Sequence, residues 1–357
     1  MIGAVRRDYP PRMEPTVRTV LGPIPPAELG RTSIHEHLLT ILDHTAFTPV
    51  DTEEGRRMAE LPVSLETRWY VRQQWVGVRD NLRLDSEATA TAEVARFKAV
   101  GGGAIADPTT DGIARNPAAL SRISRATGVH VVMGAGYYVH RSHPDWLDHA
   151  PAEHIAERIT ADLTDGVGPE GIRSGFIGEV GCSWPMTDRE RKSLRAAGMA
   201  QRAQGAPLMV HPGRHPDAPA EIVRELEAVG ADLSRTTIAH IERTLLRPED
   251  AVALARTGIR PSIDCFGLET AYYALAPVVR MPNDGGRLAF VEAMLDAGLG
   301  DRVLIAQDIC QKHRLTAYGG HGYDHLLRDI PVMLAAGGRP DVADQLLIAN
   351  PAGWLAW

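Results

Sequence analysis

Cysteine is scarce in this chain. The 357 residues include three cysteines, Cys182, Cys265 and Cys310, which is an odd number without the paired spacing of a zinc site. A disulfide framework and a cysteine-ligated metal are therefore not indicated, and the pattern favours a protein of the reducing cytoplasm. Lysine is equally scarce: of the 38 basic residues only three are lysines, namely Lys98, Lys192 and Lys312.

An excess of positive charge and long apolar runs are also missing. The formal net charge is -7, so the chain has no basic surface of the kind that nucleic-acid-binding proteins carry. No apolar run reaches the roughly 20 residues of a membrane span. The first twenty residues have no apolar core and do not predict a secretory signal, because their main feature is four arginines, Arg6, Arg7, Arg12 and Arg18. We expect neither a nucleic acid nor a membrane as partner.

What the chain does contain is an alternation of short apolar runs with amphipathic stretches. Hydrophobic residues make up 44% and charged residues 23%, as in an ordinary globular protein with a large core. The apolar runs end at a polar residue and are typical of buried strands. They predict eight strands, at about 31–35, 103–107, 129–134, 174–179, 207–211, 236–240, 260–264 and 302–308.

Helical patterns lie between these runs, at about 86–100, 117–126, 151–163, 187–203, 218–228, 248–255, 287–297 and 323–335. Thr187 and Glu190 have the spacing of a capping box, and Gly128 follows a helix end. Alternating strands and helices imply parallel strands, and eight such units favour closure into a barrel. We predict one α/β domain over residues 1–357, a (β/α)8 TIM barrel. A helical excursion at about 38–84 is expected over its mouth and a closing helix within 341–357.

Polar residues of the metal-ligand type stand at the ends of five of the predicted strands. His35 and His37 close the first apolar run, and side chains two apart in a strand share a face. Because the carboxyl ends of barrel strands form the active face, the ligand-type residues should meet there. The other four are Glu179, His211, His240 and Asp308.

Six such residues indicate more than one metal ion. Imidazole and carboxylate suit zinc, with manganese, cobalt, nickel and iron as alternatives. Six donors are too many for one four-coordinate ion that keeps a position open for substrate. They suit two ions about 3.5–4 Å apart that share a carboxylate and a hydroxide. The alternative, a hydrogen-bonded core histidine, is attractive for any one position but not for all of them together.

The chain resembles the phosphotriesterase family of the amidohydrolase superfamily over nearly its whole length. The segments that carry the resemblance are Ser33-Ile-His35-Glu-His37-Leu, Gly178-Glu179-Val-Gly, Val210-His211-Pro, Ala239-His240-Ile-Glu-Arg and Tyr318-Gly-Gly-His-Gly-Tyr-Asp-His325. The resemblance implies a more buried ion and a more exposed one. It assigns His35, His37 and Asp308 to the first, and His211 and His240 to the second.

The residue that bridges the two ions follows from the same resemblance. Many family members use a carboxylated lysine on the fourth strand, whereas the phosphotriesterase-related branch, which this chain resembles, uses glutamate. No lysine of this chain falls at the end of that strand, and Glu179 does. We therefore expect Glu179 as the bridge. Asp308 is the predicted catalytic residue, which takes a proton from the hydroxide and passes it to the leaving group.

Other candidates have weaker support. The resemblance places Tyr138 in the pocket, where it would stabilise the oxyanion, although a packing role is nearly as attractive. Asp107 and Asp264 would either orient a ligand histidine or cap a loop. Arg243 would clamp an anionic substrate group or be exposed to solvent. The loop after the eighth strand, which should shape substrate entry, carries Arg314, Tyr318 and His321. Helix starts and turns are the expected places of His140, His143, His215 and His325.

The function predicted from these residues is a binuclear metal-dependent hydrolase that acts through a metal-bridging hydroxide. The glutamate-bridged branch resembles proteins with poor organophosphate turnover, so we expect a carbonyl substrate: a lactone, an ester or an N-acyl amide. Phosphotriesterase activity as the main reaction is one alternative, and a small-molecule binding protein of the same fold is another. A metal-independent isomerase would leave four histidines without a role. A small-molecule substrate is the expected partner, and a homodimer stays open.

Overall fold

The computed structural model describes residues 14–270 and 272–357, so Arg6, Arg7 and Arg12 lie outside the described residues. Its main element is a sheet of eight strands whose neighbours all pair in parallel. In sheet order the strands are β3 (Arg31–Ser33), β6 (Gly102–Asp107), β7 (His130–Ala135), β8 (Phe176–Gly181), β9 (Leu208–His211), β10 (Thr236–Ile238), β11 (Arg260–Ile263) and β12 (Leu304–Ile305).

The first and last strands meet at their carboxyl ends and close the sheet. The backbone N–H of Asp308 donates to the carbonyl of His35 at 3.0 Å. The buried Glu36 carboxylate accepts from the backbone N–H groups of Gln307 and Ile309 at 3.0 and 2.9 Å. These contacts join the segment after β3 to the segment after β12. The predicted (β/α)8 barrel is confirmed.

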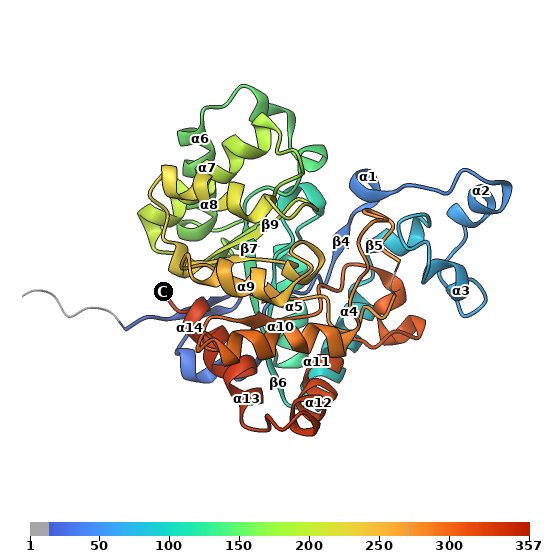
Figure 1. Cartoon of the computed structure of the whole chain (residues 1–357). Helices are drawn as coiled ribbons and strands as arrows, with labels where there is room; N and C mark the ends of the chain where they lie inside the picture. The colour runs from blue at the N-terminus through green and yellow to red at the C-terminus, as the bar shows by residue number, and fades with distance from the viewer. Residues whose placement is uncertain (1–13, 271) are drawn as a thin grey trace, which may run out of the picture.

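Helices follow the strands around the barrel (Figure 1). The capping box at Thr187 and Glu190 forms as predicted. The single helix predicted at 323–335 is wrong: it divides at Asp329, and Pro331 stands in the first turn of the second part, where its missing N–H costs nothing. The helices are α4 (Glu87–Ala99), α5 (Pro117–Thr127), α6 (Ala152–Thr164), α7 (Asp188–Gln204), α8 (Ala218–Ala228), α9 (Pro248–Ala255), α10 (Asp284–Asp296), α11 (His325–Arg328) and α12 (Ile330–Ala336).

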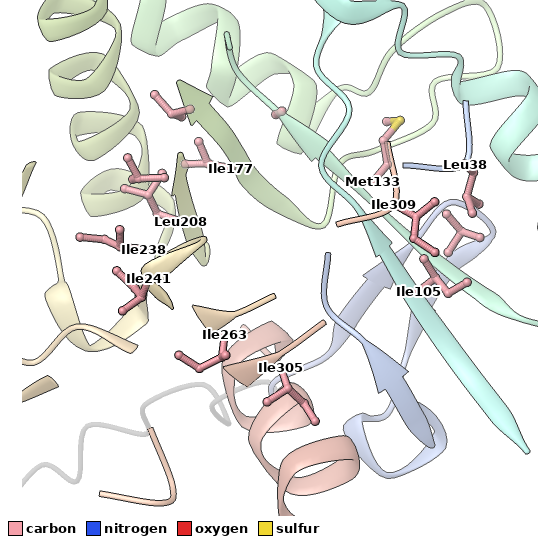
Figure 2. Packing of buried hydrophobic residues seen from close by; sticks show 14 of the residues in the cluster. Leu38, Ile105, Met133, Ile177, Leu208, Ile238, Ile241, Ile263, Ile305 and Ile309 are labelled. Carbon is pink, nitrogen blue, oxygen red and sulfur yellow. The ribbon is translucent and has the colours of Figure 1, made fainter. Parts of the chain in front are cut away.

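The core has two layers, because successive side chains of a strand point to opposite faces. In β6, Ala104 and Ala106 belong to an inner cluster while Ile105 belongs to an outer one. In β7, Val132 is inner and Met133 is outer. Figure 2 shows the outer layer, between the strands and the helices. Apolar side chains thus fill the barrel interior, and polar side chains gather above them at the carboxyl end.

The segment at 38–84 consists of short elements. They are β4 (Thr40–Ile41), α1 (Asp43–Ala46), α2 (Glu53–Ala59), α3 (Arg68–Val71) and β5 (Arg83–Leu84), with β4 and β5 paired antiparallel. Helices α2 and α3 stand away from the barrel (Figure 1). The base of the segment packs against the loop after β11, where the rings of Trp75 and Tyr273 stack 5.9 Å apart.

Both ends of the described chain lie at the amino side of the barrel. The closing segment contains α13 (Val342–Asp344), a π-helical turn (Gln345–Ala349) and α14 (Asn350–Leu355), and Trp354 packs 5.6 Å from the ring of Phe176. A hairpin that the sequence patterns did not predict, β1 (Val17–Thr19) and β2 (Gly22–Ile24), lies beside β7. No helix in the described part of the chain is long and apolar enough to cross a membrane.

Candidate metal centre

Three of the predicted ligands meet at the seam of the barrel. The Nε2 atoms of His35 and His37 each lie 3.5 Å from Oδ1 of Asp308. Both histidines come after the last residue of β3, yet they keep the alternation of a strand, because Glu36 between them turns the other way and bonds to the backbone after β12. The spacing argument for these two histidines therefore holds although the strand itself ends earlier.

A second group of three lies beside the first. Nδ1 of His211 is 3.1 Å from Oε2 of Glu179, and Nε2 of His240 is 3.4 Å from the same oxygen. His211 and His240 approach each other at 3.1 Å between Nδ1 and Nε2. The structure thus brings all six predicted ligands together in two groups of three.

Glu179 stands between the two groups. Its Oε1 is 3.5 Å from Nε2 of His37, while its Oε2 faces the second group. Strict alternation along β8 would place Glu179 on the same face as Ile177, which packs in the outer core layer. The pairing of β8 with β9 shifts between Ile177 and Val180, so both of these residues pack outward and Glu179 turns inward.

Two ligand candidates have left-handed backbone conformations. His240 has φ 55° and Asp308 has φ 49°, a costly region for residues other than glycine that clusters at functional sites. A left-handed residue cannot continue a β-ladder. The strands predicted at 236–240 and 302–308 are wrong at their carboxyl ends, because neither reaches its left-handed residue: β10 stops at Ile238 and β12 at Ile305.

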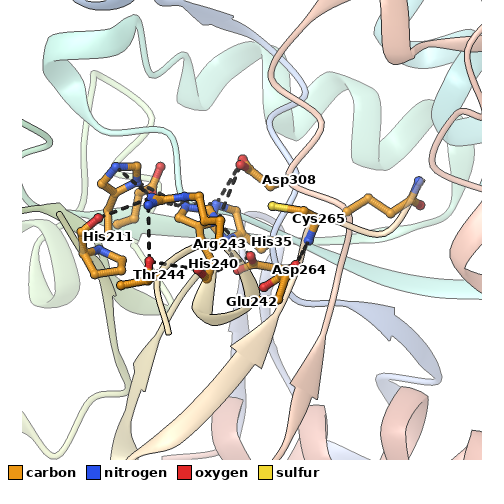
Figure 3. Close-up of polar contacts among 12 residues, drawn as sticks. His35, His211, His240, Glu242, Arg243, Thr244, Asp264, Cys265 and Asp308 are labelled. Atoms are coloured by element: carbon orange, nitrogen blue, oxygen red, sulfur yellow. Dashed lines mark hydrogen bonds and ion pairs between the residues drawn. The ribbon is translucent and has the colours of Figure 1, made fainter. Parts of the chain in front are cut away.

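Other polar side chains fix the orientation of the histidine rings. Asp264 accepts at 2.9 Å from Nδ1 of His35 and at 2.7 Å from Nδ1 of His240, so one carboxylate orients a histidine from each group (Figure 3). Thr109 lies 2.8 Å from Nδ1 of His37. With Nδ1 held in this way, the Nε2 atoms point into the centre. Nε2 of His35 is buried and has no hydrogen-bond partner among the described residues, as expected of a nitrogen that is free to bind a metal.

The carboxylates and imidazoles of the centre shift each other's pKa values. Burial raises the pKa of Glu179, but the neighbouring His211 and His35 hold that pKa well below its ordinary value. Burial lowers the pKa of His35, but Asp308 and Glu179 more than offset it, and the pKa is raised well above its ordinary value. At His211 burial outweighs Glu179, and the pKa is lowered to about 3. The carboxylates of the centre are thus ionised, and a divalent cation would balance their charge. The donor set fits two such ions.

A cavity of about 330 Å³ opens on the centre, and its wall includes His211, His240 and Asp308. The Asp308 side chain is 18% exposed, against 5% or less for the other ligand candidates. Of the predicted ligands, Asp308 is therefore the one most open to a substrate. The base of the excursion contributes to the same wall, through Leu42, Thr45, Ala46, Trp75 and Leu82.

Tyr138 and Arg243 also reach this cavity. The hydroxyl of Tyr138 lies 3.4 Å from the ring nitrogens of His211. Arg243 is only 2% exposed, and its Nη2 lies 3.3 Å from Nε2 of His211. Asp107 instead accepts from the backbone of Thr109 at 2.9 Å and caps that loop, so it acts on the ligands only indirectly.

The loop after β12 does not bring its predicted substrate-binding residues to the cavity. Arg314 donates to the backbone carbonyls of Asp308 and Phe266 at 3.0 and 2.7 Å and so fixes the loop. Tyr318 packs near Lys312 beside the excursion, and His321 is exposed. The four histidines predicted at helix starts and turns lie outside the two groups of ligand candidates. His140 lies at the rim of the cavity and His143 in the short helical turn beside it, His215 stacks on Trp184, and His325 begins α11.

The sequence analysis missed several residues of the cavity wall, among them Arg214, Trp75 and Tyr273. A signal for Arg214 was present, because it follows His211 by three residues, just as Arg243 follows His240. Trp75 and Tyr273 lie in irregular segments, where no periodicity indicates which way a side chain faces.

The chain is similar to known proteins over nearly its whole length. Residues 15–355 match the model of the phosphotriesterase family. A phosphotriesterase-related protein of Nematostella vectensis is 41% identical over 95% of this chain and 98% of its own length. The human N-acetyltaurine hydrolase is 38% identical over 96% of this chain and 98% of its own. The crystal structure of a resiniferatoxin-binding protein from Rhodobacter sphaeroides superposes with a TM-score of 0.91 and 37% identity, covering 95% of this chain and 94% of that one.

Proposed function

This chain belongs to the phosphotriesterase family and is a metal-dependent hydrolase, and we propose that it cleaves the amide bond of a small N-acylated compound whose amine part is acidic. N-Acetyltaurine, the substrate named for several relatives at 37–40% identity, is a compound of this kind. The predicted carbonyl chemistry agrees with those amide-cleaving relatives. The observation that carries the proposal is a cationic cavity wall directly beside a cluster of six metal-ligand side chains.

The family uses a binuclear metal centre, and in this chain the two groups of three would hold the ions with Glu179 shared between them. Zinc suits this set of imidazoles and carboxylates best. When bound, two such ions supply Lewis acidity and an activated water. The residues that would hold them are His35, His37, Glu179, His211, His240 and Asp308.

Hydrolysis of an amide adds the oxygen of water to the acyl carbon, breaks the C–N bond and releases the amine with a proton from that water. Asp308 is placed to carry this proton. Burial raises its pKa, but the charges on His240 and His35 hold that pKa below the ordinary value, so the carboxylate is ionised and can accept. It then returns the proton to the leaving nitrogen.

Tyr138 and Arg243 act on the charge that develops at the acyl oxygen. Burial, together with the charge of Glu179, raises the pKa of Tyr138 well above its ordinary value, so its hydroxyl keeps its proton and can donate. Arg243 has no carboxylate partner among the described residues, and its guanidinium lies against His211. Both groups would stabilise an oxyanion at this end of the cavity.

Lactone or ester hydrolysis and phosphotriesterase activity are the alternatives to amide cleavage. A neutral phosphotriester or a simple lactone gives the arginines of the wall no anion to bind, which is why we favour the acidic amide. Zinc as the native metal, a homodimer and a cytoplasmic location stay predictions.

The test is a comparison of substrates for the metal-loaded protein. We expect kcat/KM for N-acetyltaurine to exceed that for any neutral phosphotriester by at least about 10²-fold, a difference of a few kcal/mol in transition-state binding. Asp308→Asn should lower amide turnover by about 10²-fold or more. Asp296→Asn, an exposed aspartate that pairs with Arg339, serves as the control. Equal efficiency on phosphotriesters, or full turnover by Asp308→Asn, would contradict the assignment.

A further inference from the structure

The cavity wall contains more positive than negative charge. Arg141, Arg214 and Arg243 line it, and Asp308, a ligand candidate, is the only carboxylate among the described residues of the wall. Arg243 lies against His211 and serves the reacting end. Arg141 and Arg214 are therefore left to contact another part of a substrate.

Arg214 is held in place without being neutralised. Its Nε donates to the hydroxyl of Tyr273 at 2.8 Å, and its guanidinium carbon lies 5.5 Å from the centre of that ring. Among the described residues no carboxylate lies within ion-pair distance of it. A guanidinium has five N–H donors in a rigid fork, so its two terminal nitrogens have hydrogen bonds to spare.

Trp75 supports the ring that positions Arg214. It lines the cavity and stacks on Tyr273 with 26° between the ring planes. Trp75 is 6% exposed, so the stacked pair is packed into the wall and holds the Tyr273 hydroxyl beside Arg214.

Arg214 and Tyr138 line the same cavity. Tyr138 contacts His211, whereas Arg214 contacts Tyr273 beside the base of the excursion. A substrate whose carbonyl lies at Tyr138 would place its far end at Arg214.

We propose that Arg214, positioned by Tyr273 and bordered by Trp75, is the receptor for the acidic group on the amine part of the substrate. This inference rests on the proposed amide hydrolysis and adds the residue that selects the substrate. The two terminal nitrogens of the fork offer donors to the oxygens of an acidic group such as a sulfonate or a carboxylate.

The test compares Arg214→Met with the unchanged protein on N-acetyltaurine and on the neutral N-acetylethanolamine. Loss of charge-assisted hydrogen bonds should raise KM for N-acetyltaurine by about 30-fold or more, while kcat changes little because the distant group binds ground and transition states alike. Turnover of the neutral amide should change by less than about 3-fold.

Arg141→Met is the matched comparison, since it removes the same charge from the exposed rim of the same cavity. If Arg141→Met raised KM for N-acetyltaurine as much as Arg214→Met does, the arginines would attract anions in general. The proposed receptor role of Arg214 would then be wrong. The affinity for taurine, measured by calorimetry in the unchanged protein and in Arg214→Met, tests the receptor separately from the proposed function. If the unchanged protein cleaves no amide, the proposed function fails. In that case a drop of at least about 10-fold in taurine affinity in Arg214→Met still supports the receptor, and undiminished binding overturns it.

Discussion

Two buried aspartates, Asp264 and Asp284, hold histidines in opposite ways. Asp264 bonds to Nδ1 of His35 and of His240, and it leaves their Nε2 atoms turned toward the centre. Asp284 accepts from Nε2 of His325 at 2.7 Å, and the other nitrogen of that ring bonds to Asp329 at 2.6 Å. The first arrangement leaves one nitrogen of each ring turned toward the centre, and the second uses both nitrogens of its ring.

The partners of each aspartate explain the difference. Asp284 also pairs with Arg287 at 2.8 Å, a fully buried guanidinium that lies 3.6 Å from Glu242, so its network supplies its own positive charge. Around Asp264 the described residues provide carboxylates and imidazoles but no lysine or arginine pair. A buried acidic cluster without a fixed cation needs protons or metal ions to balance it. The region around Asp264 is therefore open to metal ions. The region around Asp284, which contains its own cation, is closed to them.

The largest effect that would sharpen this comparison is expected at Glu179. Glu179→Gln removes the one charge shared by both groups of three, so the protein should lose at least one of two ions and about 10³-fold or more of its activity. Elemental analysis and turnover measure the two effects. Asp250→Asn, an aspartate that pairs with Arg247 on the surface, should keep both ions. If Glu179→Gln retained two ions and most of its turnover, the shared role of Glu179 would have to be abandoned.

Replacement of each aspartate by asparagine should have opposite effects on metal affinity and on stability. Asp264→Asn weakens the orientation of one histidine in each group and should lower metal affinity by about 10- to 100-fold. Asp284→Asn leaves Arg287 buried without its closest partner and should lower the free energy of unfolding by about 3 kcal/mol while metal content stays the same. Metal titration and chemical denaturation measure the two properties. Metal loss in Asp284→Asn at unchanged stability would break the comparison.

The smallest effect concerns pH and the closed region alone. Burial lowers the pKa of His325, but hydrogen bonds to Asp284 and Asp329 raise it above the ordinary value. A histidine with a raised folded-state pKa stabilises the fold fully below its unfolded pKa of about 6.5, and that contribution is lost as pH rises through the folded value. His325→Gln should therefore destabilise the protein more at pH 6 than at pH 9, as denaturation curves would show. An equal loss at both pH values would be inconsistent with a charged His325.

The sequence by itself determined the barrel and the set of six residues. Short apolar runs, helix caps such as Thr187 and the strand–helix alternation are local properties, so they can be read without knowledge of the fold. The six ligand-type residues stand out because each follows a buried run, and parallel strands bring such positions to one end. The helix predicted at 323–335 was inexact, because it divides at Asp329, just before Pro331.

Only the tertiary structure decided how those residues are used. The inward turn of Glu179 depends on a register shift between two strands, which a strict period of two does not contain. Asp264 serves both His35 and His240, which are 205 residues apart in the chain numbering. Arg214, Trp75 and Tyr273 come from three separate irregular segments, where the side-chain direction is set by packing between loops. Contacts of this kind form only after the barrel has closed, and no local pattern records them.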